Sequence, residues 1–411
     1  MRAPLVLSAF TAYGIELEYM IVDRQTLSVL PVADELLQRA GGKRISDVER
    51  GKFGWSNEMV LHLVEIKNAQ PDPVLENISS AFHNEIQAIE RLLEPMGARL
   101  MPTAMHPWMD PRTETRLWPH DNALIYQSYD RIFNCKKHGQ ANLQSMHLNL
   151  PFADDAEFAR LHAAIRLVLP IIPALAASSP IADGKASGYL DYRMETYRTA
   201  LKQVPSAIGR VIPDTVNSCA EYEERILAPL YRDIAAFDTD GVMQHEWLNA
   251  RGAIPRFDRN AIEIRVIDIQ ECPQADLAIA AIVSAVVRSL YDGKWSTLAM
   301  QQAMGTDALV DVLHACIRDA DQAVINNSDY LHLLGFPDNQ CQAGELWRYF
   351  IETTSLSRSE YWREPLQVML ERGPLARRIL RAVGQDCSKT RLYEVYGELC
   401  ECLARGQMFA G

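Results

Sequence analysis

Four separate stretches of the chain alternate hydrophobic and polar positions, the pattern of strands with one buried face and one polar face. They span residues 14–23, 58–67, 143–150 and 261–270. Between them, apolar positions recur every three or four residues, which predicts helices. The predicted helices span residues 34–40, 73–95, 154–178, 218–232 and 275–293, and the chain from residue 294 onwards also follows a helical pattern. We therefore expect a single α+β domain over 1–411, with a core at 12–293 and a helical C-terminal portion at 294–411.

The first stretch carries two carboxylates on one strand face. Glu16 and Glu18 fall opposite a face made of Ile, Leu and Tyr residues. Residues two apart on a strand lie about 7 Å from each other, so like charges repel unless a cation or a basic group lies between them. A solvated strand face would show the same pattern. A functional role for these two carboxylates is indicated only because the other three stretches carry similar polar groups.

The second and third stretches add further polar groups of the same kind. Glu58 and Glu65 are seven residues apart and would face opposite sides of a regular strand. They can serve one site only if Glu58 lies in the turn before the strand, which we expect at 51–57, or if a bulge intervenes. In the third stretch, His147 stands between a Ser and an Asn on the polar face.

The fourth stretch combines a carboxylate with guanidinium groups. Glu263 and Arg265 share its polar face, and Arg251 and Arg256 precede it closely. An Arg beside a Glu is also an ordinary structural pair. Three guanidinium groups near one strand entrance, however, suit phosphate or carboxylate binding, because each offers a planar fork of donors. The Gly-, Ser-, Tyr- and Arg-rich segment 183–193 suits a ligand loop or an exposed linker.

Composition and charge narrow the function classes. The chain has 411 residues, 48% of them hydrophobic, and a formal net charge of −12. There is no basic run, so we expect no nucleic-acid partner and no membrane partner, only small-molecule substrates, and a homo-oligomer is left open. Eight cysteines without a Cys-x-x-Cys pair favour reduced thiols in the cytoplasm. The apolar opening 4–10 is too short for a signal peptide, and we expect no run near the ~18 apolar residues of a membrane span.

Carboxylates with one imidazole on strand faces form the donor set that Mg2+ or Mn2+ prefers. The sequence has neither a G-x-x-x-x-G-K-[ST] loop nor a G-x-G-x-x-G after a strand, so neither glycine-rich route to nucleotide binding is supported. If ATP binds, metal ions bridged by carboxylates must hold its phosphates. Arginines would then neutralise the charge of a transferred phosphoryl group.

The joint pattern resembles the glutamate-cysteine ligase superfamily, in particular its second bacterial branch, which includes carboxylate-amine ligases. The motifs that carry this resemblance follow the family's order and read G-I-E-L-E at 14–18, E-x6-E at 58–65, H-x-N at 147–149 and E-I-R-V-x-D at 263–268. The resemblance implies a glutamine synthetase-like fold, an antiparallel sheet whose concave polar face holds Mg2+ ions and ATP while helices cover the other face. It also implies that ATP phosphorylates a carboxylate, such as the γ-carboxylate of glutamate, and that an amine, such as that of cysteine, then forms an amide.

The resemblance also assigns residues. Six side chains would be metal ligands, namely Glu16, Glu18, Glu58, Glu65, His147 and Glu263. Arg265 and Arg251 would take part in catalysis at the phosphates, and Arg256 and Arg265 would bind the cofactor ATP. The chain departs from the branch at Asn149 and Lys67, which puts the identity of the acid and the amine in doubt. Two other functions stay open, an amino-acid or guanidino kinase and a non-catalytic binding protein on the same fold.

Overall fold

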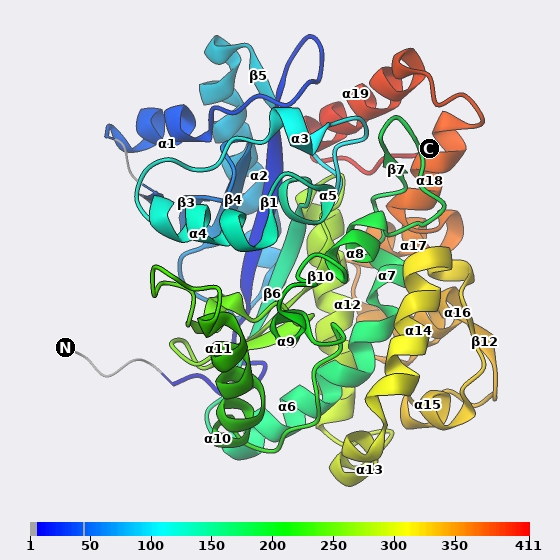
Figure 1. Cartoon of the computed structure of the whole chain (residues 1–411). Coiled ribbons are helices and arrows are strands. Elements are labelled where there is room, and N and C mark those ends of the chain that lie inside the picture. The colour runs from blue at the N-terminus through cyan, green and yellow to red at the C-terminus, as the bar shows by residue number, and fades with distance from the viewer. Residues whose placement is uncertain (1–5, 44–45) are drawn as a thin grey trace.

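Eight antiparallel strands form one sheet in the computed structural model, which describes residues 6–43 and 46–411 except the side chain of Ser357 (Figure 1). The strand order is β2-β3-β4-β1-β6-β10-β9, and β5 pairs with the second half of β1. The strands are β1 (Gly14–Asp23), β2 (Asp47–Arg50), β3 (Phe53–Asn57), β4 (Leu63–Asn68), β5 (Ala98–Met101), β6 (Ser145–Pro151), β9 (Ala253–Arg256) and β10 (Ala261–Asp268). Residues 4 and 5 of the apolar opening lie outside the described part of the chain.

The central strand β1 separates two different environments, as its alternation predicts. Ile15, Leu17 and Tyr19 are fully buried in the main hydrophobic core, beneath helices. Glu16 and Glu18 point to the opposite face and are also more than nine-tenths buried. Their burial comes from other segments that cover the polar face, which strand periodicity does not reveal.

Helices cover the apolar face of the sheet. The long ones are α2 (Leu75–Leu93), α6 (Asp155–Val168) and α12 (Pro273–Tyr291), and α12 packs against both of the others. The predicted helices are confirmed. α1 (Ala33–Gly41) ends at Gly42, which adopts a left-handed φ of 74°. The helix after residue 154 is interrupted by a 3-10 turn at a proline before α7 (Ile172–Ala176).

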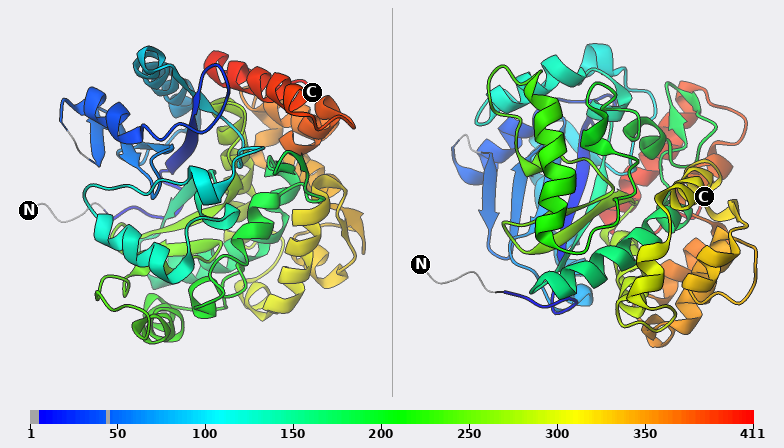
Figure 2. Two further views of the ribbon diagram at one scale, coloured as in Figure 1. Left: turned by 45° about the horizontal axis from the view of Figure 1, so that its top comes forward. Right: turned by 60° about the horizontal axis from the view of Figure 1, so that its bottom comes forward.

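The polar face is covered from two sides (Figure 2). One side is formed by α3 (Pro111–Glu114), α4 (Ala123–Phe133) and α5 (His138–Ala141). The other is formed by α8 (Tyr192–Tyr197), α9 (Pro205–Ile208), α10 (Cys219–Tyr222) and α11 (Ala228–Ala235), with a π-helical turn at Glu223–Leu227. The hairpin β7 (Ile181–Ala182) and β8 (Lys185–Ala186) precedes α8.

The predicted helical C-terminal portion is confirmed, and it closes one end of the polar face. Its helices are α13 (Leu298–Ala303), α14 (Thr306–Asp319), α15 (Ser328–Leu333), α16 (Ala343–Thr353), α17 (Arg363–Arg372), α18 (Leu375–Val383) and α19 (Lys389–Arg405), joined by the short pair β11 (Val324–Ile325) and β12 (Cys341–Gln342). Met20 and Val22 continue the face of Glu16 and Glu18 but pack in an apolar cluster with residues of α18 and α19. The polar site is therefore restricted to the first half of β1.

Two local predictions are wrong. The segment 53–57 is strand β3, because the turn is confined to Gly51 and Lys52 and the following residues pair with both β2 and β4. The strand expected at 58–67 begins only at Leu63. The residues before it leave the sheet because Val60 bridges to Leu117 and the His62 imidazole contacts the Ala141 carbonyl at 2.8 Å.

Two helical segments are long and apolar enough for a membrane span by length and composition, contrary to the expectation that no run comes near that length. They are Asp155–Ala176 and Pro273–Tyr291. Within the fold, however, 94% and 72% of these windows are buried. Their apolar composition is therefore explained by their packing in the core between the sheet and the other helices.

Candidate active site

Strand register brings the predicted side chains into two rows across the polar face. Glu16 on β1 lies directly opposite His147 on β6, and Glu18 lies directly opposite Glu65 on β4. Directly paired residues of antiparallel strands share a face and lie close together. Glu263 joins them from β10, on the other side of β6.

His147 lies at the centre of the cluster. Its Nδ1 is 2.9 Å from Glu16 Oε2 and 3.9 Å from Glu263 Oε1, and its Nε2 is 3.8 Å from Glu18 Oε1. Two groups of three each offer donor atoms that lie within 4.8 Å of one another. The first group is Glu16, His147 and Glu263, and the second is Glu18, Glu65 and His147. Either group could hold a metal ion.

Glu58 reaches the same hollow from outside the strands. It lies in the connection between β3 and β4 and lines the hollow together with Glu18 and Glu65. The spacing conflict with Glu65 disappears because Glu58 precedes the strand, which was one of the two conditions set by the sequence. The sequence therefore identified Glu58 as a candidate, but it did not show which way the Glu58 side chain points.

The cluster carries more negative charge than its neighbours neutralise. Burial and then the charge of Glu16 raise the pKa of Glu65 to about 7, and burial with Glu18 and Glu65 raises the pKa of Glu58 well above its ordinary value. Burial alone would lower the pKa of His147, but the hydrogen bond to Glu16 and the nearby carboxylates raise it to about 9. Carboxylates forced to hold protons are the expected signature of a cation site. Five carboxylates with one imidazole are a donor set that fits hard divalent ions such as Mg2+.

Glu263 is the exception because basic groups surround it. Burial would raise its pKa, but Arg265, His147 and Arg256 hold it well below the ordinary range. Arg256 Nη1 lies 2.8 Å from Glu263 Oε2, and Arg265 donates to Oε1 from Nε at 3.1 Å and also from Nη2. Two guanidinium groups therefore lie directly beside a carboxylate that could hold a metal ion.

Arg251 does not reach the cluster, so its expected role at the phosphates is not supported by its position. Its guanidinium donates to the Ser206 carbonyl at 3.0 Å and to Asn249 Oδ1 at 3.2 Å, and pairs with Asp214 at 3.3 Å. The reason is that side chains alternate between the two faces along an extended chain. Arg251 and Arg256 are an odd number of residues apart, so an extended chain sends them to opposite faces of the sheet.

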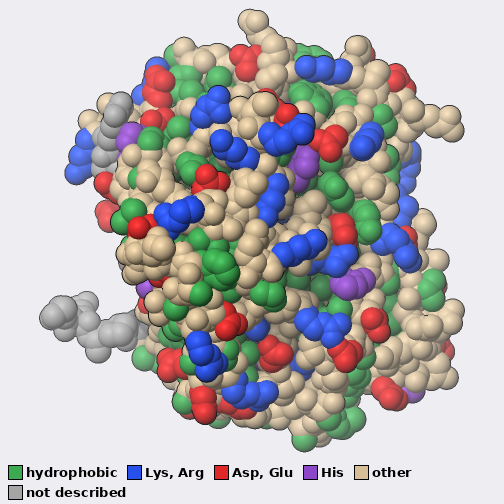
Figure 3. Space-filling model, viewed as in Figure 1, with side chains coloured by type: hydrophobic (Ala, Val, Ile, Leu, Met, Phe, Trp, Pro, Cys, Tyr) green, Lys and Arg blue, Asp and Glu red, His purple; other side chains and the backbone are tan. Residues whose placement is uncertain are grey.

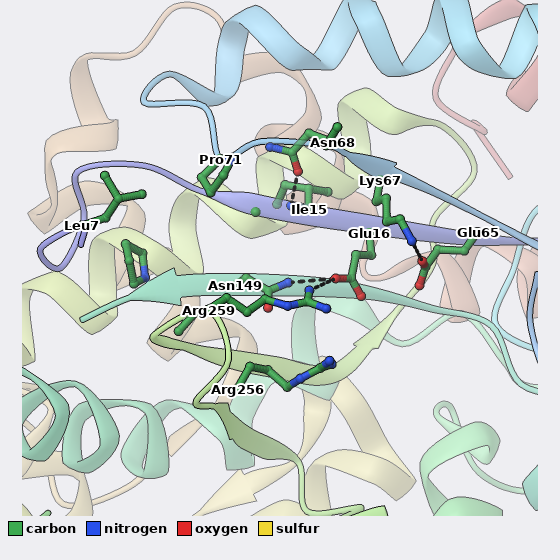
Figure 4. Close-up of a pocket in the computed structure, with 14 residues that line it drawn as sticks. Leu7, Ile15, Glu16, Glu65, Lys67, Asn68, Pro71, Asn149, Arg256 and Arg259 are labelled. Carbon is green, nitrogen blue, oxygen red and sulfur yellow. Dashed lines mark hydrogen bonds and ion pairs between the residues drawn. The ribbon is translucent and has the colours of Figure 1, made fainter. Parts of the chain in front are cut away.

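Three basic residues in the site were missed as functional candidates. Arg259, in the turn between β9 and β10, lies 3.4 Å from Glu16 Oε1. Lys67 on β4 lies directly opposite Glu16 and has its ammonium 3.4 Å from Glu65 Oε1 (Figure 4). Arg193 of α8 lines the hollow around His147. The sequence offered two signals. Lys67 has an even spacing from Glu65, and Arg193 ends the segment 183–193 that suits a ligand loop or an exposed linker.

The polar face contains two adjoining hollows that share Glu16, Glu65 and Arg256. The first, of about 300 Å³, is centred on His147 and is also lined by apolar residues of the β3–β4 connection. The second, of about 450 Å³, lies towards the beginning of β1 and is bordered by Lys67, Arg259 and apolar residues that include Leu7 and Pro71 (Figure 4). Each hollow is thus bordered by three Lys or Arg side chains, and the smaller hollow contains more carboxylates than the larger one.

The two segments that cover the site are joined over it. Ser128 Oγ and Arg131 Nη2 of α4 donate to Asp240, in the loop after α11, at 2.6 Å and 2.8 Å. On the face seen in Figure 3, basic and acidic side chains of the described residues are interspersed.

The model of the glutamate-cysteine ligase family 2 matches residues 12–383. An uncharacterized protein of Archaeoglobus fulgidus is 32% identical over 397 residues, which cover 96% of this chain and 99% of that protein. Proteins named "Putative glutamate--cysteine ligase 2" from Bradyrhizobium and Rhodospirillum rubrum are 25% and 26% identical and align with 68% and 71% of this chain. The chain spans 62% and 68% of their lengths.

Solved structures share the fold. A glutamate–cysteine ligase from Francisella tularensis, in complex with AMP, superposes with a TM-score of 0.56 at 12% identity, covering 97% of this chain and 90% of that one. A bifunctional glutathione synthetase from Pasteurella multocida gives a TM-score of 0.57 at 10% identity, covering 95% of this chain and 53% of that one. The predicted α+β fold, with one antiparallel sheet carrying the site, is confirmed.

Proposed function

Because the chain belongs to the glutamate-cysteine ligase family 2, we propose that it is an ATP-dependent ligase that joins a carboxylate to an amine. The proposed acid is glutamate, acting through its γ-carboxylate, and the proposed amine is cysteine or another amino compound. The observation that carries the proposal is the pair of three-donor groups around His147 with Arg256 and Arg265 directly beside them. This set combines ligands for metal ions with donors for phosphate oxygens.

The proposed reaction has two steps. A carboxylate oxygen of the acid attacks the terminal phosphorus of ATP, and ADP leaves. The amine nitrogen then attacks the acyl carbon, phosphate leaves with the bonding electrons, and the nitrogen gives up a proton as the amide forms. In both steps the protein acts mainly by stabilising the charge that develops on the phosphoryl group and the acyl phosphate, and it forms no covalent bond to the substrates.

Six side chains would hold the metal ions, namely Glu16, Glu18, Glu58, Glu65, His147 and Glu263. Bound Mg2+ would neutralise the phosphate charge of ATP and so assist the departure of ADP. Arg265 and Arg256 would donate to oxygens of the transferred phosphoryl group, since each keeps N–H groups beyond those that Glu263 accepts. Glu263 keeps both guanidinium groups in place before the substrates arrive.

In this proposal, each of the two hollows binds different substrates. The larger hollow would take the nucleotide, because Lys67, Arg256 and Arg259 offer cations to a polyphosphate and Leu7 and Pro71 offer apolar surface. The smaller hollow would take the acid and the amine beside His147. The shared wall at Glu16, Glu65 and Arg256 is where the transferred phosphoryl group would lie.

The test is ADP release from Mg2+ and ATP with a panel of amino acids and amines, including L-glutamate alone and L-glutamate with L-cysteine. We expect release that requires both an acid and an amine, and a new amide detected by mass spectrometry. A stable phosphorylated product that forms without an amine would instead identify a kinase. Absence of both products with every pair would reject the ligase for the substrates tested.

A further inference from the structure

Glu58 differs from the other proposed metal ligands in the way that it is held. The others lie on β1, β4, β6 and β10, and each of these strands is paired with a strand on either side. Glu58 lies in the connection between β3 and β4. Among the residues that the structure describes, its carboxylate has no hydrogen-bond donor and no ion-pair partner. The sheet alone therefore does not fix the direction of this side chain.

The Asn57 amide links Glu58 to helix α4. Asn57 Nδ2 donates to the Glu58 carbonyl oxygen at 3.0 Å and to the Tyr126 hydroxyl at 3.1 Å. An amide nitrogen carries two N–H groups, so both hydrogen bonds can form at once. Burial, and next the charge of Glu58, raise the pKa of the Tyr126 phenol to about 12. The phenol of α4 therefore lies close to Glu58 and is connected to its backbone.

The residue after Glu58 is held by the segments on either side of α4. Before the helix, Trp118 donates its backbone N–H to the Met59 carbonyl oxygen at 2.9 Å. After the helix, Cys135 Sγ lies 3.3 Å from Met59 Sδ. Residues before, within and after α4 thus contact both chain neighbours of Glu58. A movement of α4 would change the conformation of the connection that carries this carboxylate.

Helix α4 is bounded by two residues with left-handed backbones and is tied down in its middle. Asn122 precedes it with a φ of 68°, and Asn134 follows it with a φ of 57°. Asn tolerates this conformation better than most residues, and terminal residues of this kind can absorb a hinge motion. Ser128 and Arg131 both donate to Asp240, at 2.6 Å and 2.8 Å. One carboxylate of the opposite cover therefore holds α4 over the site.

We propose that α4 positions Glu58 as a metal ligand, with Asn57 and Tyr126 as positioning residues and Asp240 as the group that holds the helix in place. The inference rests on the proposed function, because it concerns the metal ions of that same site. Groups that orient a metal ligand typically contribute about 10- to 100-fold to metal affinity. Here the hydrogen bond reaches the backbone of the ligand, so its contribution should lie at the lower end of this range.

The test measures Mn2+ binding to the full chain from the electron paramagnetic resonance signal of the free ion. Tyr126→Phe keeps the ring and removes the phenol oxygen, so we expect binding of one Mn2+ to weaken by about 10-fold. Asp240→Ala releases the middle of α4 and should weaken the same ion by a similar factor. In ADP release, both variants should require more Mg2+ but reach a rate near that of the wild type at saturating Mg2+.

A double-mutant cycle with Glu58→Gln separates positioning from a general loss of structure. If Tyr126 and Asp240 act through Glu58, neither replacement should weaken Mn2+ binding further once Glu58→Gln is present. Tyr349→Phe is the matched control. The Tyr349 hydroxyl donates to the Gly335 carbonyl oxygen in the C-terminal portion and lines neither hollow, so this variant should keep the wild-type Mn2+ affinity.

Three results would overturn the inference. The first is a wild-type protein that binds no Mn2+, and the second is a folded Tyr126→Phe or Asp240→Ala protein that keeps the wild-type affinity. The third is a loss of affinity that is equally large with and without Glu58→Gln. The proposed ligase is decided separately, because a wild type that binds Mn2+ but releases no ADP with any pair refutes the ligase and leaves the Mn2+ affinities to decide the role of α4.

Discussion

Replacement of Glu263 by Gln tests the site with little change in side-chain volume. Glu263 is fully buried on β10 and belongs to one of the two three-donor groups. Its carboxylate accepts from Arg256 at 2.8 Å and from Arg265 Nε at 3.1 Å. The amide keeps one acceptor oxygen but removes the negative charge that both guanidinium groups and a metal ion would share.

The cost in stability follows from these two contacts. Hydrogen bonds to charged groups contribute about 1.5–3 kcal/mol and neutral ones about 1 kcal/mol, so each contact loses roughly 0.5–2 kcal/mol. The side chains of Arg256 and Arg265 are 20% and 19% exposed, and water can therefore replace part of the loss. We expect the free energy of unfolding without metal to fall by about 2 kcal/mol. A domain stable by about 5–15 kcal/mol remains folded after that loss.

The metal-dependent effects should be larger. A ligand at about 100 times its dissociation constant raises the free energy of unfolding by about 2.7 kcal/mol. In Glu263→Gln we expect this Mg2+-dependent stabilisation to be mostly lost, and ADP release to fall by at least about 100-fold. Thermal unfolding with and without Mg2+ measures the first quantity, and coupled ADP detection measures the second.

Glu90→Gln is the matched control for this experiment. Glu90 is a glutamate on α2 whose side chain is only 14% exposed, and it pairs with Arg24 at 3.2 Å, away from both hollows. Its replacement should reduce stability but leave the Mg2+ response and ADP release unchanged. If Glu263→Gln kept both the Mg2+ response and full turnover, Glu263 would be neither a metal ligand nor an anchor for the arginines.

Three further outcomes are expected. Arg265→Lys should reduce ADP release by about 100-fold while the protein stays folded, because a point charge cannot copy a bidentate fork, and full activity would refute this role. Burial lowers the pKa of His62 and of His106 to about 4. The unfolded chain binds these protons near pH 6.5, so the free energy of unfolding should fall as pH drops from about 6.5 to 4, approaching 3 kcal/mol per imidazole. Urea titrations at several pH values measure this, and an unchanged pH slope in His62→Gln would contradict it. A Cβ at Gly139 would lie 2.6 Å from the Thr196 carbonyl oxygen, so Gly139→Ala should lose about 1–3 kcal/mol, and an unchanged thermal midpoint would refute this close approach of α5 to α8.

Strand periodicity in the sequence was enough to predict which polar side chains share a strand face, whereas their role as metal ligands was implied by the family resemblance. The two-residue repeat places Glu16 with Glu18 and Glu263 with Arg265 whatever the neighbouring strands are, because alternation depends only on the local backbone. The same local rule predicted β1 and the polar face of His147. Helix periodicity predicted α2, although its N-cap is Val74, without a side-chain cap, and not the expected Asp72. The glycine pair at 41–42 predicted the end of α1.

Only the tertiary structure decided which basic residues join the carboxylates. Arg251 and Arg259 come from one short segment, yet the pairing of β9 with β10 turns Arg259 towards Glu16 and Arg251 away from it. Arg193 reaches the hollow because Asp268, 75 residues further along the chain, holds its side chain. Register and long-range contacts depend on the packing of the whole chain, and local patterns of hydrophobic and polar residues do not encode them.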